Sequence, residues 1–113
     1  MNNRQFPWLI LVPRRTGKRE LFELAPDDYR LAMEEIRAVS HAMATLTTAH
    51  KMNLATLGNI VPQLHIHIIA RFEHDAAWPN PIWNHSTDSA PYTNDMLADV
   101  MSKIRTVLNI TKM

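Results

Sequence analysis

The sequence predicts an α+β protein with a mostly antiparallel sheet, one long helix and a C-terminal helix. Two observations carry this prediction: strand-like apolar runs and helical stretches are segregated along the chain, and the two helical stretches show clear amphipathic periodicity. The 113 residues are 46% hydrophobic and 20% charged, which is enough to build a packed core. We therefore expect a single domain over residues 1–113.

The first strand is expected over residues 6–12. This run is apolar throughout and is closed by Pro13, so the pattern predicts a strand buried on both faces. Residues 14–18 follow as a polar turn, and residues 20–24 are expected to be a short extended piece. Four basic residues lie in this turn and directly after it. They could form a solvated surface or a patch that faces phosphate: Arg14, Arg15, Lys18 and Arg19.

A long helix is expected to begin at Pro26 and to end near His50. Proline suits the first turn, and Asp27 and Asp28 favour the positive end of the helix dipole. Apolar residues then recur at steps of three and four and form one stripe. Its members are Tyr29, Ala32, Met33, Ile36, Val39, Met43 and Leu46.

The remaining elements follow from turn residues and apolar runs. Residues 52–57 are a second strand candidate ended by Gly58, and the third strand runs to about Phe72, followed by a turn over residues 73–75. Residues 78–83 contain two prolines, which predicts an irregular extended arm. After a polar loop over residues 85–92, Thr93 is a plausible N-cap. The second helical stripe is Leu97, Val100, Met101, Ile104, Val107 and Leu108.

The third strand, over residues 63–72, holds the candidate functional residues. Because strand side chains alternate between faces, one face should carry Gln63, His65, His67 and Arg71, with Ile69 among them. The other face should be core, and consists of Leu64, Ile66, Ile68 and Ala70. An apolar face opposite a polar face with two histidines is typical of a site built on a rigid element.

Three interpretations of the histidine pair remain open on the residues alone. His65 could be a nucleophile toward phosphorus, since a neutral imidazole with an ordinary pKa of about 6.5 attacks well near neutral pH, and His67 could then bind phosphate oxygens. The pair could instead ligate a metal, although Glu73, His74 and Asp75 lie beyond the strand end. Finally, both could be partly buried polar residues satisfied by their neighbours.

Charge and composition limit the classes of partner. The net charge of +1 gives no support for binding a nucleic acid polymer, which usually requires a basic excess. The absence of cysteine excludes disulfides and thiolate metal sites, and fits a cytoplasmic protein. The apolar run over residues 8–12 is too short for a signal peptide or a membrane span, so no membrane association is expected.

Residues 62–71 resemble the signature of the histidine triad family, in which histidines alternate with apolar residues before a small and a basic residue. Residues 8–14 resemble the family's apolar strand ending in proline and a basic residue, and residues 57–61 resemble the turn before the signature. Trp78-Pro79 resembles the C-terminal arm of the nucleotide-binding branch. The resemblance covers about residues 6–83 and is greatest to small bacterial proteins described as diadenosine-tetraphosphate-hydrolase-like.

This resemblance implies a hydrolase or transferase acting at the α-phosphorus of a nucleotide, on a phosphoanhydride or phosphoramidate bond. His65 stands where the family has its nucleophile, which forms a nucleotidyl-histidine that water then hydrolyses. His67 would contact a phosphate oxygen, Asn59 would lie near phosphate in the turn, and Asn53 falls near a polar position that contacts the nucleotide. No cofactor is expected to be required, although Mg²⁺ could accompany the substrate phosphates of a nucleotide or dinucleoside polyphosphate.

The sequence departs from the family pattern in two places. Gln63 replaces the first histidine; it can bind substrate by hydrogen bonds but cannot become a cation, which makes a non-catalytic nucleotide-binding protein the alternative. The segment matching Trp8 also follows almost directly after residue 1, so we expect the helix and strand that usually precede it in the family to be missing, which would leave a sheet edge bare. A homodimer, common in the family, would cover such an edge.

Overall fold

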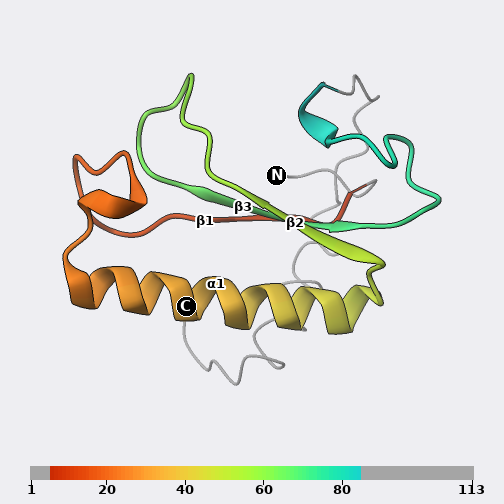
Figure 1. The fold of residues 1–113 in the computed structure, drawn as a ribbon, viewed down its shortest axis with the longest axis horizontal. Coiled ribbons are helices and arrows are strands. Elements are labelled where there is room, and N and C mark those ends of the chain that lie inside the picture. Colours follow the sequence, from red (N-terminus) through yellow and green to blue (C-terminus); the bar gives the residue numbers. More distant parts are fainter. Residues whose placement is uncertain (1–5, 85–113) are drawn as a thin grey trace, which may run out of the picture.

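The computed structural model describes residues 6–84 and contains a three-stranded antiparallel sheet with one long helix on one of its faces (Figure 1). In the spatial order β1-β3-β2, the strands are β1 (Trp8–Leu11), β3 (Ile66–Arg71) and β2 (Lys51–Ala55). Short 3₁₀ helices η1 (Leu21–Glu23) and η2 (Ile82–Asn84) complete the fold. The predicted α+β class is confirmed; the loop over residues 85–92 and the C-terminal helix lie outside the described residues.

Helix α1 (Pro26–Thr47) begins at the predicted proline and ends three residues before His50. Thr48 takes the left-handed conformation, with φ of 51°, and its N–H donates to the carbonyl of Ala44, which closes the helix. Ala32, Val39 and Met43 of the predicted stripe are buried. Tyr29 and Leu46 also belong to this stripe, but they lie toward the two ends of the helix and are 41% and 39% exposed.

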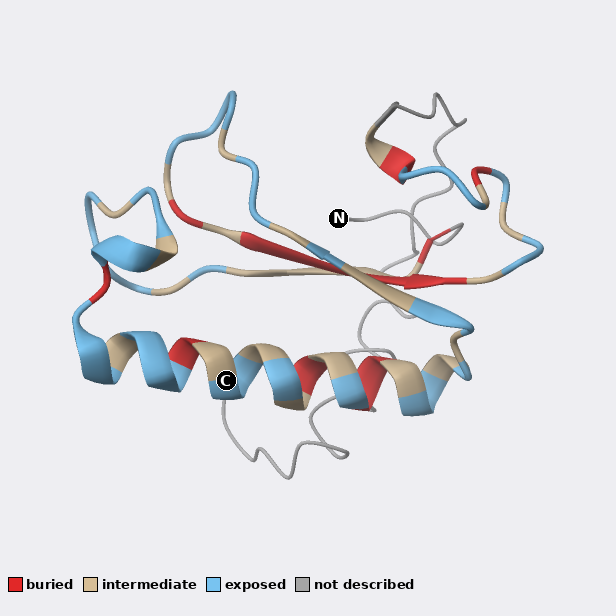
Figure 2. Cartoon of the chain, viewed as in Figure 1, coloured by how far each residue is buried: buried red, intermediate tan, exposed pale blue. Residues whose placement is uncertain are grey.

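The main core lies between α1 and the sheet. Strand β3 runs through the middle of the sheet and is buried along its whole length, as Figure 2 shows in red. Its predicted apolar face is confirmed as core: Leu64, Ile66, Ile68 and Ala70 pack with Leu24 and the helix residues. Burial of side chains of this size contributes about 1.5–3 kcal/mol each, so this face anchors β3 firmly.

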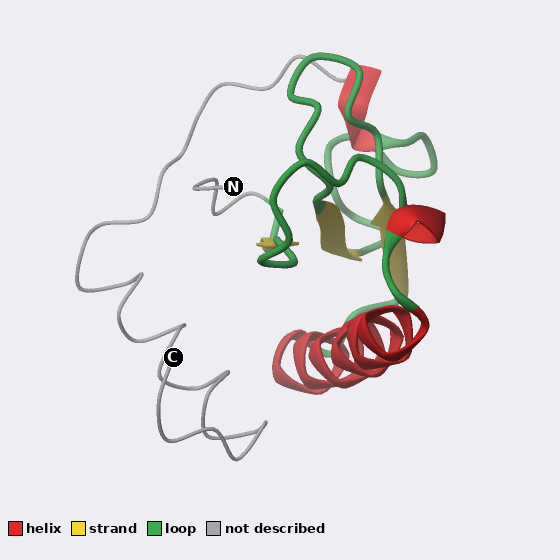
Figure 3. Ribbon diagram, turned by 90° about the vertical axis from the view of Figure 1, so that its left-hand side faces the viewer, coloured by secondary structure: helices red, strands yellow, loops and turns green. Residues whose placement is uncertain are grey.

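The opposite face of the sheet is covered at one end by the arm that follows β3. Phe6, Ile69, Ala77 and Ile82 form a second buried cluster, and η2 lies on the side of the sheet away from α1 (Figure 3). The predicted arm over residues 78–83 is irregular, as expected, but it is not extended, because it consists of turns and the start of η2 and is folded back onto the sheet. The rest of this face holds the histidines.

Several predicted boundaries were wrong, each for a local reason. Strand β1 is shorter than predicted and is half-buried because, among the described residues, it pairs only with β3. Residues 20–24 contain η1 instead of an extended piece, since the Glu23 carboxylate accepts hydrogen bonds from the backbone N–H of Glu20 and Arg19. Strand β2 begins and ends earlier than predicted, and β3 begins three residues late because the N–H of Leu64 donates to the carbonyl of Lys18.

Arg71 at the end of β3 lies on the same face of the sheet as His67, as the sequence predicts, but it is buried under the arm and is not exposed beside the histidines. Its side chain is buried and donates through Nε and Nη2 to both carboxylate oxygens of Asp75, at 2.8 and 3.0 Å. Nη1 donates to Oδ1 of Asn53 and Nη2 to the carbonyl of Asn80. The guanidinium also lies 5.7 Å from the ring centre of Trp78. The hydrogen bonds of Arg71 therefore connect the arm to the sheet, and its side chain is shielded from solvent.

This ion pair predicts a loss of stability in acid. Burial would raise the pKa of Asp75, but hydrogen bonds from Arg71 and from the N–H groups of Phe72 and Trp78 lower it to about 2. Because the folded-state pKa lies below the unfolded value, the stabilisation is present above about pH 4 and disappears as the pH falls toward 2. We expect urea unfolding to show a loss of roughly 2 kcal/mol over this range that is absent in Asp75→Asn. If Asp75→Asn loses as much unfolding free energy between pH 4 and pH 2 as the wild type does, this assignment is wrong.

Within residues 6–84, no helix is long and apolar enough to cross a membrane.

Candidate active site

His67 lies in the middle of the sheet, on the face opposite α1. In the register of the sheet it stands opposite Ile10 of β1 and Ala55 of β2. Opposed residues of antiparallel strands share a face, so these three side chains belong to the same surface. His65 comes just before the first residue of β3, and the two imidazole ring centres are 5.0 Å apart. The structure thus brings together the two histidines that the sequence predicts as the site.

The ring of His65 is oriented by the backbone of its own segment. Its Nδ1 lies 2.6 Å from the carbonyl oxygen of Gln63. A carbonyl oxygen only accepts hydrogen bonds, so neutral His65 carries its proton on Nδ1 and keeps the lone pair on Nε2. The residue is partly exposed, which leaves the ring within reach of a ligand.

The ring of His67 is oriented by a tryptophan from the neighbouring strand. The indole Nε1–H of Trp8 donates to Nδ1 of His67 at 3.0 Å. An indole nitrogen only donates, so neutral His67 must carry its proton on Nε2. Burial lowers the pKa of His67, and the nearby charge of His65 lowers it further, so the neutral form is favoured at pH 7.

Aromatic rings surround His67 on two sides. Trp8 from β1 and Trp83 from η2 contact it edge-on, with ring centres 5.6 and 5.0 Å away. The two tryptophans also contact each other, at 5.5 Å. Trp8 was predicted to be plain core, and its contact with His67 was missed; the register of β1 against β3 would have revealed it. Trp83 shows that the arm does reach the histidine face.

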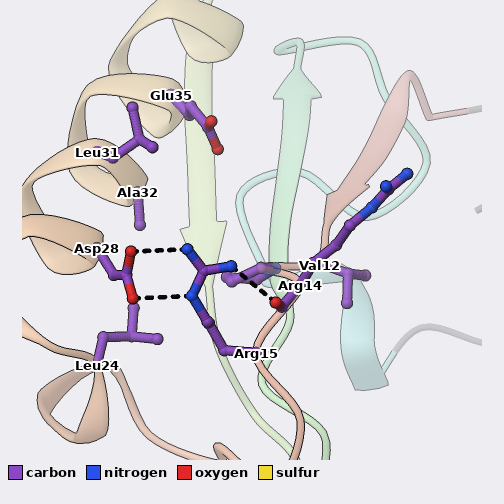
Figure 4. Close-up of a pocket in the computed structure, with 9 residues that line it drawn as sticks. Val12, Arg14, Arg15, Leu24, Asp28, Leu31, Ala32 and Glu35 are labelled. Atoms are coloured by element: carbon purple, nitrogen blue, oxygen red, sulfur yellow. Dashed lines mark hydrogen bonds and ion pairs between the residues drawn. The ribbon is translucent and has the colours of Figure 1, made fainter.

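The basic loop over residues 14–18 runs beside the histidine segment. Nε2 of Gln63 donates to the carbonyl of Arg15 at 3.3 Å, and the N–H of Leu64 donates to the carbonyl of Lys18 at 2.9 Å. The Arg15 side chain turns toward α1 and makes a two-point ion pair with Asp28, while the Arg14 side chain points away from α1 (Figure 4).

Comparison with known proteins decides the family. The sequence model of the HIT domain family matches residues 1–74 of this chain. The chain belongs to the HIT domain family. Proteins of this family are generally nucleotide hydrolases or transferases. Among curated proteins, none matches the chain.

Solved structures of HIT proteins match almost the whole chain, each with a TM-score of 0.89. A histidine triad protein from Sinorhizobium meliloti 1021 is 40% identical over 94% of this chain and 78% of its own. One from Marinobacter aquaeolei VT8 is 43% identical over 96% and 79%, and one from Bradyrhizobium japonicum is 39% identical over 96% and 80%. The histidine triad fold is therefore confirmed.

The other predicted site residues of this HIT protein lie apart from the histidines or on the loop beside them. Asn53 lies on the same face of the sheet as His67. However, it is paired with Ile69 in the register and accepts a hydrogen bond from buried Arg71. It therefore lies roughly 13 Å along the strand from His65. Asn59 is exposed on the loop between β2 and β3, after Gly58, whose φ of 75° requires glycine. Nucleotide contacts of Asn53 and Asn59 stay predictions.

A pocket of about 320 Å³ lies elsewhere in this HIT protein, between α1 and the end of β1 (Figure 4). It is lined by the Arg15–Asp28 ion pair and by apolar side chains that include Leu24 and Leu31. Neither histidine lines it. The candidate active site lies on the face of the sheet away from α1 and is separate from this pocket.

Metal binding finds no support in the donor set of the described residues. Across residues 6–84, no group of three or more His, Cys, Asp or Glu side chains could hold a metal ion. Of the acidic candidates beyond the strand end, Asp75 is fully engaged by Arg71 and by backbone N–H groups, and the carboxylate of Glu73 lies 3.4 Å from Nδ1 of His50. What this HIT protein does present is one imidazole with a free lone pair beside one imidazole with a free N–H.

Proposed function

We propose that this HIT protein is a nucleotide hydrolase or nucleotidyl transferase that acts through a covalent intermediate on His65. The observation that carries the proposal is the 2.6 Å hydrogen bond from Nδ1 of His65 to the carbonyl of Gln63. It directs the lone pair of Nε2 away from the backbone, as a nucleophile needs. A rigid, buried strand directly after His65 holds this ring in position, which lowers the entropic cost of the attack.

In the proposed reaction, Nε2 of His65 attacks the α-phosphorus of a nucleotide and the bond to the leaving group breaks. The leaving group departs with the electron pair of that bond, and a phosphorus–nitrogen bond joins the nucleotide to His65. Water, or another acceptor in a transfer, then displaces His65 and releases a nucleoside monophosphate or its ester. Nε2–H of His67, at the neighbouring ring, donates to a non-bridging phosphate oxygen and stabilises its developing charge.

As the substrate we propose a dinucleoside polyphosphate, as in the diadenosine-polyphosphate-hydrolase-like branch. The leaving group of such a substrate is a nucleoside polyphosphate with several negative charges. Arg14 is exposed and follows β1 directly after Pro13, its side chain points away from α1, and the ion pairs among residues 6–84 do not include it (Figure 4). A guanidinium in this place matches the geometry and charge of a phosphate chain. Mg²⁺ would accompany the substrate phosphates and needs no protein site.

Substrate turnover tests the proposed function. The protein is incubated with diadenosine tetraphosphate and with adenosine 5′-phosphoramidate, and products are separated by chromatography. We expect AMP from both, and a quenched reaction should show one AMP added to the protein mass, on the peptide that contains His65. Release of AMP without any adduct in rapidly quenched samples would argue against the covalent route.

Replacement of Arg14 tests the proposed leaving group. We expect Arg14→Gln to lower kcat/KM for diadenosine tetraphosphate by about tenfold, because a charged hydrogen bond to the leaving phosphates is lost. The phosphoramidate, whose leaving group is a small amine, should be affected much less. Arg30→Gln is the matched control, since it also removes one positive charge but from an exposed ion pair with Asp27 on α1. Equal losses on both substrates would contradict a leaving-group role.

The alternative is a non-catalytic nucleotide-binding homodimer. Gln63 in the first triad position favours it, because this side chain is used to hold the basic loop and cannot act as a cation. Tight binding of a non-hydrolysable dinucleoside polyphosphate by calorimetry, with no product from the natural substrate, would select this alternative. The homodimer and the cytoplasmic location belong to both proposals, and sedimentation would test the first of them.

A further inference from the structure

Trp8 and His67 form a diagonal pair across neighbouring strands. Trp8 stands opposite Ile69 in the register and Ile10 stands opposite His67, so Trp8 and His67 share the face away from α1. The indole N–H spans the diagonal and reaches Nδ1 of His67 at 3.0 Å. Trp83 packs against both rings, which limits their rotation. The contact is therefore built into the sheet and does not depend on a ligand.

This contact selects one of the three forms of an imidazole. The cation carries protons on both nitrogens and the Nδ1–H tautomer carries one on Nδ1, so neither can accept the indole N–H. Only the neutral Nε2–H form fits. His65 is held in the opposite tautomer by the carbonyl of Gln63. The two neighbouring imidazoles are thus prepared for different tasks, one as a lone-pair donor and the other as a proton donor in a hydrogen bond.

We infer that Trp8 is a positioning residue that holds His67 in the neutral Nε2–H form, so that His67 can donate to a phosphate oxygen while His65 attacks. The reaction in this statement rests on the proposed function, whereas the tautomer does not. If His67 took the other tautomer, its Nε2 lone pair would face the phosphate oxygens and repel them. Trp8 therefore determines whether the second histidine helps or opposes the substrate.

The surroundings of His67 leave few other groups that could set its protonation. Ile10, Ala55, Trp8 and Trp83 are uncharged, and His65 is the titratable neighbour among the described residues that contact it. Within residues 6–84, no buried side-chain nitrogen or oxygen lacks a hydrogen-bond partner. Since the side-chain hydrogen bond of His67 runs through Nδ1, its Nε2–H is left without a side-chain partner within residues 6–84.

Nitrogen NMR of the histidine rings tests the tautomer directly, in the full chain without substrate. In the wild type, we expect His67 to show an unprotonated Nδ1 and a protonated Nε2, and His65 to show the reverse. This first measurement needs no variant, so it does not depend on a mutant that folds. A proton on Nδ1 of His67 at neutral pH in the wild type would overturn the inference.

Trp8→Phe removes the indole N–H and keeps an aromatic ring. We expect the pKa of His67 to rise by about one unit, because Nδ1 becomes free to take a proton, while the tautomer of His65 is unchanged. The kcat/KM for diadenosine tetraphosphate should fall by about tenfold. Trp83→Phe is the matched control for the NMR measurement, since it alters a ring beside His67 without touching the Trp8 hydrogen bond.

The outcomes separate this inference from the proposed function. An unchanged pKa and tautomer of His67 in Trp8→Phe would overturn the positioning role, even if the protein turns over nucleotides. A shifted tautomer with unchanged kcat/KM would also overturn it. If no nucleotide is turned over by the wild type, the proposed function fails, while the NMR result still decides what Trp8 does to His67.

Discussion

Replacement of His65 by alanine is expected to lower the turnover of diadenosine tetraphosphate by roughly 10⁴-fold or more, as loss of a covalent nucleophile does. The reason is local: among residues 6–84, His65 is the imidazole whose Nδ1–H donates to a backbone carbonyl, which keeps the lone pair on Nε2. His67 cannot substitute, because its Nδ1 is occupied by Trp8 and its Nε2 carries the proton. Steady-state kinetics with product analysis by chromatography measures the effect.

Nucleotide binding should largely survive in His65→Ala, since the phosphate contacts proposed for His67 and Arg14 remain. Calorimetry with a non-hydrolysable dinucleoside polyphosphate would show this. His41→Ala is the matched control, because His41 is exposed on α1 and far from the sheet face that holds the site. If His65→Ala and His41→Ala turn over substrate equally well, His65 is not the nucleophile.

Replacement of Arg71 by alanine is expected to give the largest loss of stability, about 3–5 kcal/mol in the free energy of unfolding. The side chains of Arg71 and Asp75 are 1% and 3% exposed, so the substitution leaves a buried carboxylate without its counter-charge. It also removes the hydrogen bonds to Asn53 and Asn80 that hold β2 and the arm to β3. Urea unfolding followed by circular dichroism would measure the loss.

Two further variants separate the ion pair from general effects of removing an arginine. Arg30→Ala breaks an exposed pair on α1, and its expected cost is below about 1 kcal/mol. The double variant Arg71→Met with Asp75→Asn removes both charges and keeps a side-chain oxygen that can accept the N–H groups of Phe72 and Trp78. It should recover part of the stability, because no buried charge is left unpaired. A cost for Arg71→Ala as small as that for Arg30→Ala would show that the buried network contributes little.

The fold could be predicted well wherever local pattern and burial agree. The helix start at Pro26 and the apolar face of β3 follow from side-chain periodicity and from the preference of proline for a first helical turn. Boundaries were less accurate where a single tertiary hydrogen bond decides them. The N–H of Leu64 donates to Lys18, far away in the sequence, and this bond delays the start of β3. A rule based on neighbouring residues in the sequence cannot identify that partner.

Only part of the candidate site could be predicted, because its remaining contacts also depend on segments that are far away in the sequence. His65 and His67 could be found from the alternation of one strand and from the resemblance to the family. The partners of those rings come from other segments: Trp8 lies 59 residues before His67 in the chain. Strand alternation places Arg71 on the same face as the histidines. In the folded chain, however, Asp75 and Trp78 cover its side chain. The sequence pattern could not distinguish a polar residue under the arm from one in the open.

The class of fold, the core face of β3 and the histidine pair could all be predicted from residue patterns, because strand and helix periods place side chains on faces without knowledge of distant partners. The folded chain was needed to show which imidazole nitrogen carries a proton and which arginine is buried. Those properties depend on single contacts between strands β1 and β3 and between β3 and its arm. A proton on an imidazole is placed by the atom opposite it, and that atom is supplied by the folded chain.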